Sequence, residues 1–371
     1  MAEVAVDSRT VTLAEAKTRI LDAFEIKQPV FLWGLPGIGK SELMEQICTE
    51  ESLGATHLVD IRVALMEPTD LRGMPYFDKN TGKMLWAPPV DLPDEELASQ
   101  FDTVVLFLDE MNSAAPAVQA AGYQLVLNRR IGTYKLPDNV VIVAAGNRES
   151  YKGVTYRMPT PLANRFCHLE VRVDFDSYLD WAVAHRIHED VIGYVSFAKG
   201  DLCDFNPRSS GRSFATPRSW TYVSKFVNKP GMTDERLIDL VSGCVGEGIA
   251  IKFMAHRKIS KDMPMPADIL AGKVKSLKIK EISAQYALTI GMCYELKDAY
   301  DDFGKKDATK WHKMADNFFR FMMDNFPTEM TVMGARTAIT NYSLPFQPNK
   351  LAHFKEFFDR FGKYVVKAME D

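Results

Sequence analysis

The first 172 residues alternate between short apolar runs and stretches with helical periodicity. The runs "VFLW", "FDTVVLFLDE" and "VVIVAAGN" are almost wholly apolar before their polar ends, which is typical of strands that a parallel sheet buries on both faces. Amphipathic segments lie between the runs or before them, such as "TLAEAKTRILDAF" with Thr10 or Thr12 as its N-cap. Alternating strand and helix signals predict an α/β fold.

From about residue 173 the periodicity is helical, interrupted by "FNPRSSGRSFATP" and "DMPMPAD". The chain has 371 residues, and a single hydrophobic core usually stops growing at roughly 250–300 residues. We therefore expect an α/β domain over residues 1–172 and a helical domain over 173–260. A C-terminal helical extension over 261–371 can be continuous with the second domain.

The stretch "VFLWGLPGIGKSELMEQI" passes from an apolar strand through a glycine-rich loop into an amphipathic helix. Its G-x-x-x-x-G-K-S spacing is that of a P-loop. Glycines allow backbone angles that turn successive N–H groups toward an anion, and the helix N-terminus adds partial positive charge. Lys40 would reach the β- and γ-phosphates of a nucleotide, and Ser41 would ligate Mg²⁺. The expected nucleotide-binding residues are Gly34, Leu35, Pro36, Gly37, Ile38, Gly39, Lys40 and Ser41.

Two acids, Asp109 and Glu110, end the apolar strand "VVLFLDE". Ligands of open α/β sheets bind at the carboxyl edge of the strands, where these acids would lie. We expect Asp109 to orient Mg²⁺ and Glu110 to polarise the attacking water, as in P-loop enzymes. A pair of solvated acids at a strand end is the weaker interpretation.

Three further polar residues are candidates. Asn147 ends "VVIVAAGN", where its amide would reach the γ-phosphate or the water, although a turn residue explains it equally well. Arg165, in "LANRF", and Arg218, in "TPRSW", could each spread charge over a transferring phosphoryl group. Either arginine could instead form a surface salt bridge, and the residues alone leave both interpretations open.

The order of these motifs resembles that of an AAA+ ATPase of the MoxR family, near the magnesium-chelatase branch. The resemblance rests on "GLPGIGKS", "LMEPTDLRGMPY", "VVLFLDEMNSAAPAVQAAGYQLVLNRRIG", "LPDNVVIVAAGNR", "MPTPLANRF" and "TPRSW", and it covers roughly residues 10–260. It implies a P-loop AAA+ three-layer αβα domain followed by an all-helical lid and C-terminal region.

The resemblance also implies roles for the residues that match its motifs. They are Walker A for Lys40 and Ser41, Walker B for Asp109 and Glu110, sensor 1 for Asn147, arginine finger for Arg165, and sensor 2 for Arg218. Asn164 stands where the family more often has Asp. Hairpins expected at 74–89 and 129–139 occupy the places of two family inserts, as ordinary connections or as surfaces facing a ring pore or client.

By this resemblance the chain is an ATP-hydrolysing ring ATPase, expected to be a hexamer, with ATP and Mg²⁺ as cofactors. It would act as a chaperone-like remodelling factor or metal-insertion helper, together with a partner bearing a von Willebrand factor A domain. Docking of that partner is expected on the helices over 261–371.

Charge and composition bear on which functional classes fit the chain. The net charge of −4 argues against coating nucleic acid by bulk electrostatics. The rival is nonetheless a nucleic-acid motor, such as a helicase loader or restriction-type translocase, while a switch that binds ATP without hydrolysis conflicts with Glu110. No secretory signal or membrane-spanning run is visible. Five scattered cysteines indicate reduced thiols in a cytoplasmic protein.

Two arginines to which no motif role is given, Arg129 and Arg130, could contact the nucleotide or a neighbouring subunit. We favour a solvated helix end for both.

Overall fold

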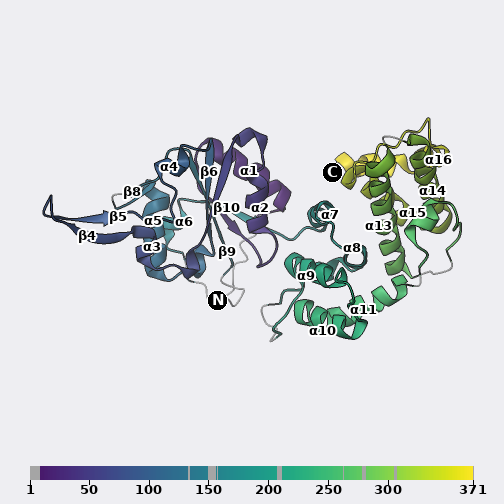
Figure 1. Cartoon of the computed structure of the whole chain (residues 1–371), viewed down its shortest axis with the longest axis horizontal. Coiled ribbons are helices and arrows are strands. Elements are labelled where there is room, and N and C mark those ends of the chain that lie inside the picture. Colours follow the sequence, from purple (N-terminus) through teal and green to yellow (C-terminus); the bar gives the residue numbers. More distant parts are fainter. Residues whose placement is uncertain are drawn as a thin grey trace. The chain divides into compact units, whose positions relative to one another are not determined.

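The computed structural model describes residues 9–132, 134–148, 156, 158–206, 211–261, 263–277, 281–304 and 307–370. The chain divides into two compact units (Figure 1). The first contains the described residues up to Asp174, together with Phe205 and Asn206, and the second contains the other described residues. The separate helical domain at 173–260 and the extension at 261–371 stay a prediction.

A six-stranded parallel sheet forms the centre of the first unit. In spatial order its strands are β1 (Thr10–Val11), β10 (Cys167–Val171), β2 (Val30–Trp33), β9 (Val140–Gly146), β6 (Thr103–Asp109) and β3 (Thr56–Arg62). The predicted α/β fold is confirmed. The short β1 was not predicted: Thr10 pairs with Glu170 in it, and Thr12 caps the following helix.

Helices cover both faces of this sheet (Figure 1). On one face lie α1 (Leu13–Glu25) and α2 (Lys40–Ile47), and on the other lie α3 (Pro68–Arg72), α5 (Pro116–Asn128) and α6 (Thr160–Ala163). Successive strand residues point to opposite faces. Val30 and Leu32 therefore pack toward α1 and α2, while Phe31 between them packs into the other layer.

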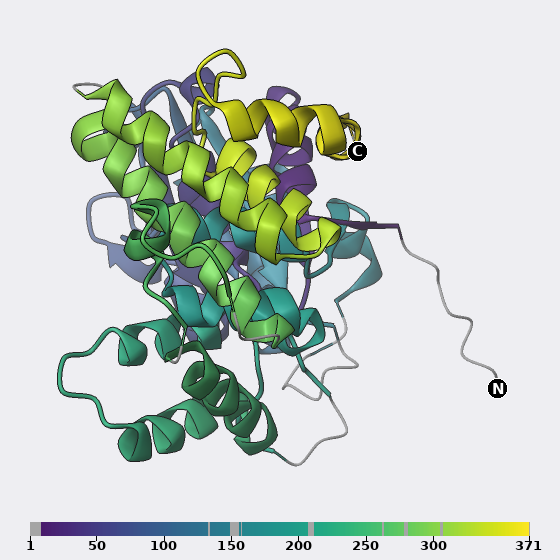
Figure 2. The ribbon, with the colours of Figure 1, turned by 90° about the vertical axis from the view of Figure 1, so that its right-hand side faces the viewer.

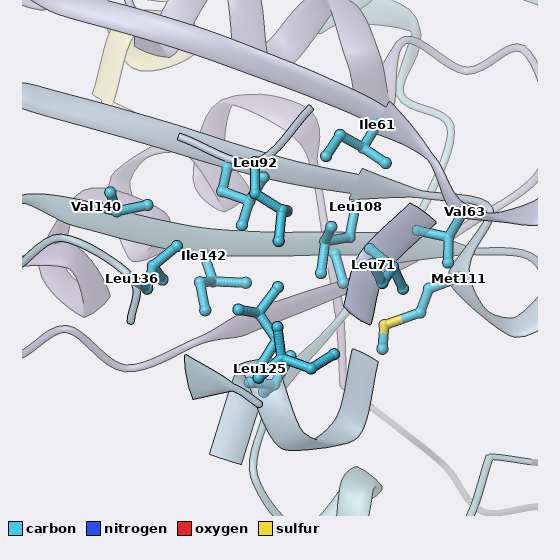
Figure 3. Close-up of a cluster of buried hydrophobic side chains, with 14 of the residues drawn as sticks. Ile61, Val63, Leu71, Leu92, Leu108, Met111, Leu125, Leu136, Val140 and Ile142 are labelled. Carbon is cyan, nitrogen blue, oxygen red and sulfur yellow. The ribbon is translucent and has the colours of Figure 1, made fainter. Parts of the chain in front are cut away.

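Large apolar side chains form the core on the α5 side of the sheet (Figure 3). Leu108 and Ile142 of the sheet lie close to Leu125 of α5, and Leu71 of α3 lies near Met111 (Figure 3). All five side chains are at most 3% exposed. Burying large apolar side chains on both faces of the sheet stabilises the three layers together.

Two hairpins and a short helix complete the first unit. β4 (Met74–Asp78) pairs antiparallel with β5 (Lys83–Ala87), and β7 (Arg130–Ile131) pairs with β8 (Tyr134–Lys135). Both hairpins lie within the predicted ranges. Thr133, between β7 and β8, lies outside the described residues. α4 spans Glu95–Ala98.

Every regular element described in the second unit is a helix, as predicted for this half of the chain. The α-helices are α7 (Phe175–Ala184), α8 (Glu189–Phe197), α9 (Pro217–Val227), α10 (Asp234–Val245), α11 (Glu247–Lys261), α12 (Pro266–Leu270), α13 (Ile282–Ala299), α14 (Ala308–Asn325), α15 (Thr328–Arg336) and α16 (Ala352–Glu370). Figure 2 shows the yellow-green and yellow helices near the C-terminus, where α14 packs on α13, α15 and α16. None of the described helices combines the length and apolar character that crossing a bilayer requires.

An aromatic cluster packs α8, α9 and α11 together. Tyr194, Trp220 and Phe253 are each at most 2% exposed, and their ring centroids lie 5.5–5.6 Å apart. His256 of α11 lies edge-on to the Tyr194 ring at 5.6 Å. Burial lowers the pKa of His256 to about 4, although the negative charge of Asp190 opposes the shift. The imidazole is therefore neutral in the folded protein near neutral pH.

The buried imidazole makes stability depend on pH. Because its pKa is lower in the folded state, the unfolded chain binds the extra proton first as pH falls from about 6.5 toward about 4. The free energy of unfolding should fall in this window by up to about 3 kcal/mol. Urea denaturation across the window should show a flatter pH dependence for His256→Gln. Parallel profiles for the variant and the wild type would contradict this assignment.

Candidate functional site

The loop between β2 and α2 has the backbone shape that the P-loop spacing predicts. Gly37 and Gly39 have φ of +74° and +105°, in the left-handed region that side chains with a Cβ rarely adopt. Gly34 was expected to need a backbone angle that other residues avoid, but its φ is not positive. A Cβ on Gly34 would lie 2.6 Å from Cδ1 of Ile38.

The Lys40 ammonium lies inside this loop, and the residue is only 9% exposed. Its Nζ donates to the backbone oxygens of Gly34 at 3.0 Å and Leu35 at 2.9 Å. It also donates to Oδ1 of Asn147 at 3.4 Å. The structure thus brings together two residues that are 107 positions apart in the sequence and were predicted to share a site.

Ser41 and Asp109 meet where α2 begins and β6 ends. The Ser41 hydroxyl donates to Oδ2 of Asp109 at 3.2 Å, and Oδ1 of Asp109 accepts from the backbone N–H of Glu110 at 2.8 Å. A hydroxyl and a carboxylate are hard oxygen ligands of the kind that Mg²⁺ prefers. This pair therefore fits the metal site predicted for it.

Glu110 follows in an unusual backbone conformation. Its φ of +55° is in the left-handed region, and its side chain is exposed. The chain turns out of the sheet here into the short helix η3 (Met111–Ser113). The acid is therefore presented at the sheet edge beside Asp109, accessible to a water molecule.

A third acid near this edge was not predicted. Asp60 lies on β3, opposite Phe107 of the neighbouring β6. Burial and the negative charge of Asp109 raise the pKa of Asp60. The two acids are thus close enough for their charges to interact, while the positive charge of Arg62 opposes the shift at Asp60. Its position in "LVDIR", inside a strand, was the available sequence signal.

Asn112 is the second residue that sequence reasoning missed. It is 1% exposed and pairs with the backbone of Asn147 through both ends of its side-chain amide. A polar residue two positions after the acid pair was the only signal.

The two candidate arginines lie on other elements than the residues described so far. Arg165 follows α6 and precedes β10, with its side chain exposed and its backbone oxygen accepting from Nε2 of Gln28 at 2.8 Å. Arg218 is exposed in the first turn of α9 in the second unit, where Thr216 forms the N-cap. Their predicted roles stay proposals.

The interpretation of Arg129 as a solvated helix end is wrong. Its backbone is left-handed with φ of +50°, and Nη2 donates to the oxygens of Pro137 at 2.7 Å and Val140 at 2.8 Å. Burial lowers the pKa of its guanidinium. Arg129 therefore ties the end of α5 to the start of β9, whereas Arg130 is exposed.

Comparison with known proteins identifies the first unit. Residues 30–171 match the family model described as ATPase family associated with various cellular activities (AAA). They form an AAA ATPase domain. Midasin of Giardia intestinalis is 28% identical over 193 residues, which are 48% of this chain and 4% of midasin. The chain thus spans only a small part of that relative.

Solved structures give weaker similarities. The RuvB Holliday junction branch migration motor of Thermotoga maritima aligns with 67% of this chain and 74% of its own, at 19% identity and a TM-score of 0.34. NtrX of Brucella abortus in complex with ATP aligns with 81% of this chain and 69% of its own, at 12% identity and a TM-score of 0.36. At this level neither structure indicates what this chain acts on.

Replacing Lys40 tests the loop directly. Lys40→Ala removes the buried cation that would face the phosphates, so ATP affinity should fall. Hydrogen bonds to charged groups contribute roughly 1.5–3 kcal/mol, which corresponds to about ten- to a hundredfold in affinity. Calorimetric titration with ATP measures the loss.

Lys17→Ala is the matched control, because Lys17 forms an ion pair with Glu50 on the surface of α1. This variant should keep the wild-type affinity. Wild-type affinity in Lys40→Ala would refute the assignment of the loop to phosphate binding.

Proposed function

Starting from the AAA ATPase domain at residues 30–171, we propose that the chain is an ATP-hydrolysing ring ATPase of the MoxR type. One observation carries the proposal: Lys40, Ser41, Asp109 and Asn147 converge at the carboxyl edge of three adjacent strands, β2, β9 and β6. β2 lies between β9 and β10, so the chain crosses over it after β9. Such a crossover marks the usual ligand position of an open α/β sheet.

Each residue at this edge has a part in hydrolysis. Lys40 binds the β- and γ-phosphates, and the N–H groups of the loop and of α2 surround them. Asn147 orients the γ-phosphate or the water, and Glu110 accepts the proton of that water. Ser41 and Asp109 would hold Mg²⁺, which neutralises charge on the phosphates when it is bound.

Arg165 acts on a neighbouring subunit in this proposal. Cys167 at the start of β10 pairs with Val30 at the start of β2, whereas Gly34 follows the other end of β2. Gly34 lies four residues beyond Val30, and a strand advances about 3.3 Å per residue. Arg165 precedes Cys167 by two residues, so it lies beyond the opposite edge of the sheet. Arg165 is exposed and its backbone thus lies at the opposite edge of the sheet from its own P-loop, which supports a finger supplied in trans.

A closed ring is the assembly that we propose, because in it each subunit supplies its arginine to the next and every site is completed. We propose a hexamer that works as a chaperone-like remodelling or metal-insertion factor. The von Willebrand factor A domain partner would dock on the helices over 261–371, and Arg218 would act as sensor 2. These finer parts rest on the resemblance of the motifs to the MoxR family.

The two acids should fail in different ways. Glu110→Gln keeps the shape of the side chain but cannot accept a proton, so ATP should bind and persist unhydrolysed. Asp109→Asn should weaken Mg²⁺-dependent binding, because a neutral amide is a poorer ligand for the metal. Filter binding with labelled ATP, with and without Mg²⁺, separates the two effects. Equal loss of affinity in both variants would refute this division of roles.

Mixed rings test the position of Arg165. Arg165→Ala should bind ATP and barely hydrolyse it, since a finger supplied in trans contributes about 10³–10⁵ in rate. Co-expression with Glu110→Gln creates interfaces in which an intact Glu110 faces an intact Arg165. Part of the ATPase activity should return in co-purified mixed rings.

No recovery at any ratio, in rings shown to contain both variants, would contradict the role in trans. Recovery in a preparation that is monomeric would contradict the ring. Stimulation of the wild-type ATPase by DNA, lost at higher salt, would instead favour the nucleic-acid motor.

A further inference from the structure

The buried side-chain amide of Asn112 forms hydrogen bonds with both backbone groups of Asn147. Asn112 lies in η3, directly after the acid pair, and is 1% exposed. Its Oδ1 accepts from the backbone N–H of Asn147 at 3.2 Å, and its Nδ2 donates to the backbone oxygen of Asn147 at 2.6 Å. Its own backbone oxygen accepts from the N–H of Tyr156 at 2.7 Å.

The Asn112 side chain provides Asn147 with the backbone hydrogen bonds that a neighbouring strand would otherwise provide. β6 pairs with β9 only as far as Leu108 and Ala144. Beyond that point Glu110 turns the chain out of the sheet with its left-handed backbone. The peptide groups of Asn147 then face no strand on that side, and the amide of Asn112 supplies one acceptor and one donor in its place.

The close approach requires glycine at position 146. A Cβ on Gly146 would lie 2.2 Å from Oδ1 of Asn112 and 2.9 Å from Cζ of Phe31. Real Cβ atoms essentially never come this close to another heavy atom, so a larger residue at position 146 would push the Asn112 amide out of its place. The sequence Gly146-Asn147 and the residue Asn112 are therefore one structural unit.

This unit reaches the P-loop lysine. Oδ1 of Asn147 accepts from Nζ of Lys40 at 3.4 Å. The orientation of the Asn147 side chain depends on its backbone, which Asn112 holds from the Walker B side. A change in the chain after Glu110 would thus be transmitted to the amide that faces Lys40.

We propose that Asn112 is a positioning residue for ATP hydrolysis, which acts by fixing the backbone of Asn147. The proposal rests on the proposed ATPase function. Asparagine is required because the position needs a donor and an acceptor on one short side chain. Aspartate at the same position offers two acceptors, one of which would face the backbone oxygen of Asn147 without a proton between them.

A double-mutant cycle on kcat tests this inference. Asn112→Ala, Asn147→Ala and the double variant are compared with the wild type in steady-state ATP hydrolysis. Misplacing a catalytic group by about 1 Å can cost up to about a hundredfold in rate. Asn112→Ala should therefore lower kcat by about ten- to a hundredfold, with KM changed much less.

The double variant should hydrolyse ATP no more slowly than Asn147→Ala alone, because Asn112 acts only through Asn147. A structural role would lower stability and would not remove additivity in kcat. If Asn112→Ala does not fold, the same cycle is run with Asn112→Asp, which keeps the volume of the side chain and replaces its donor by a charged acceptor.

Asn139→Ala is the matched control. Its Nδ2 donates to the backbone oxygens of Ala98 and Phe101, both at 2.9 Å, in the loop before β6. This variant loses two donated hydrogen bonds of a half-buried asparagine that lies directly before β9, at the opposite end of that strand from Asn147. Its kcat should stay within about twofold of the wild type.

The outcomes separate this inference from the proposed function. Additive losses in kcat, or an unchanged kcat in Asn112→Ala, would overturn the positioning role while the ATPase function stands. An unchanged kcat in Asn147→Ala would do the same. No ATP hydrolysis by the wild type would overturn the proposed function itself, and this inference with it.

Discussion

The ammonium of Lys40 is a nearly buried cation, and such a group is tolerated only where oxygen atoms surround it. The backbone oxygens of Gly34 and Leu35 come from the loop after β2, and the amide oxygen of Asn147 comes from the end of β9. The loop must therefore close on the lysine, and β9 must end level with β2. The register of Trp33 opposite Gly146 satisfies this requirement.

This constraint explains why the site tolerates so few residue types. Asn147 can face Lys40 only if its backbone is held, and Gly146 leaves room for the amide of Asn112 that holds it. On the other side, Ser41 of the same helix as Lys40 reaches Asp109 at the end of β6. Lys40 and Ser41, neighbours at the start of one helix, thus connect the ends of three strands through hydrogen bonds.

The parallel sheet places residues that follow its strands and residues that precede them at opposite edges. Residues after the strands gather at one edge, where Lys40, Asp109 and Asn147 lie, and residues before the strands lie at the other. Arg165 precedes β10 and belongs to that second edge. The polarity of the strands, and no property of Arg165 itself, is what favours its action on another subunit.

The sequence by itself determined the glycine-rich loop between β2 and α2, the acid pair at the end of β6, strands β2, β6 and β9 of the sheet, the hairpin within 74–89, and the helical character of the second half. These signals are local: apolar period, glycine spacing and turn chemistry all act within a few residues. Only the tertiary structure decided that Asn112 holds Asn147 and that Arg129 binds the oxygens of Pro137 and Val140. Each of these depends on atoms from segments that are apart in the chain. A buried polar group must find its partner wherever the fold brings one near, so its role is visible only once the chain has folded.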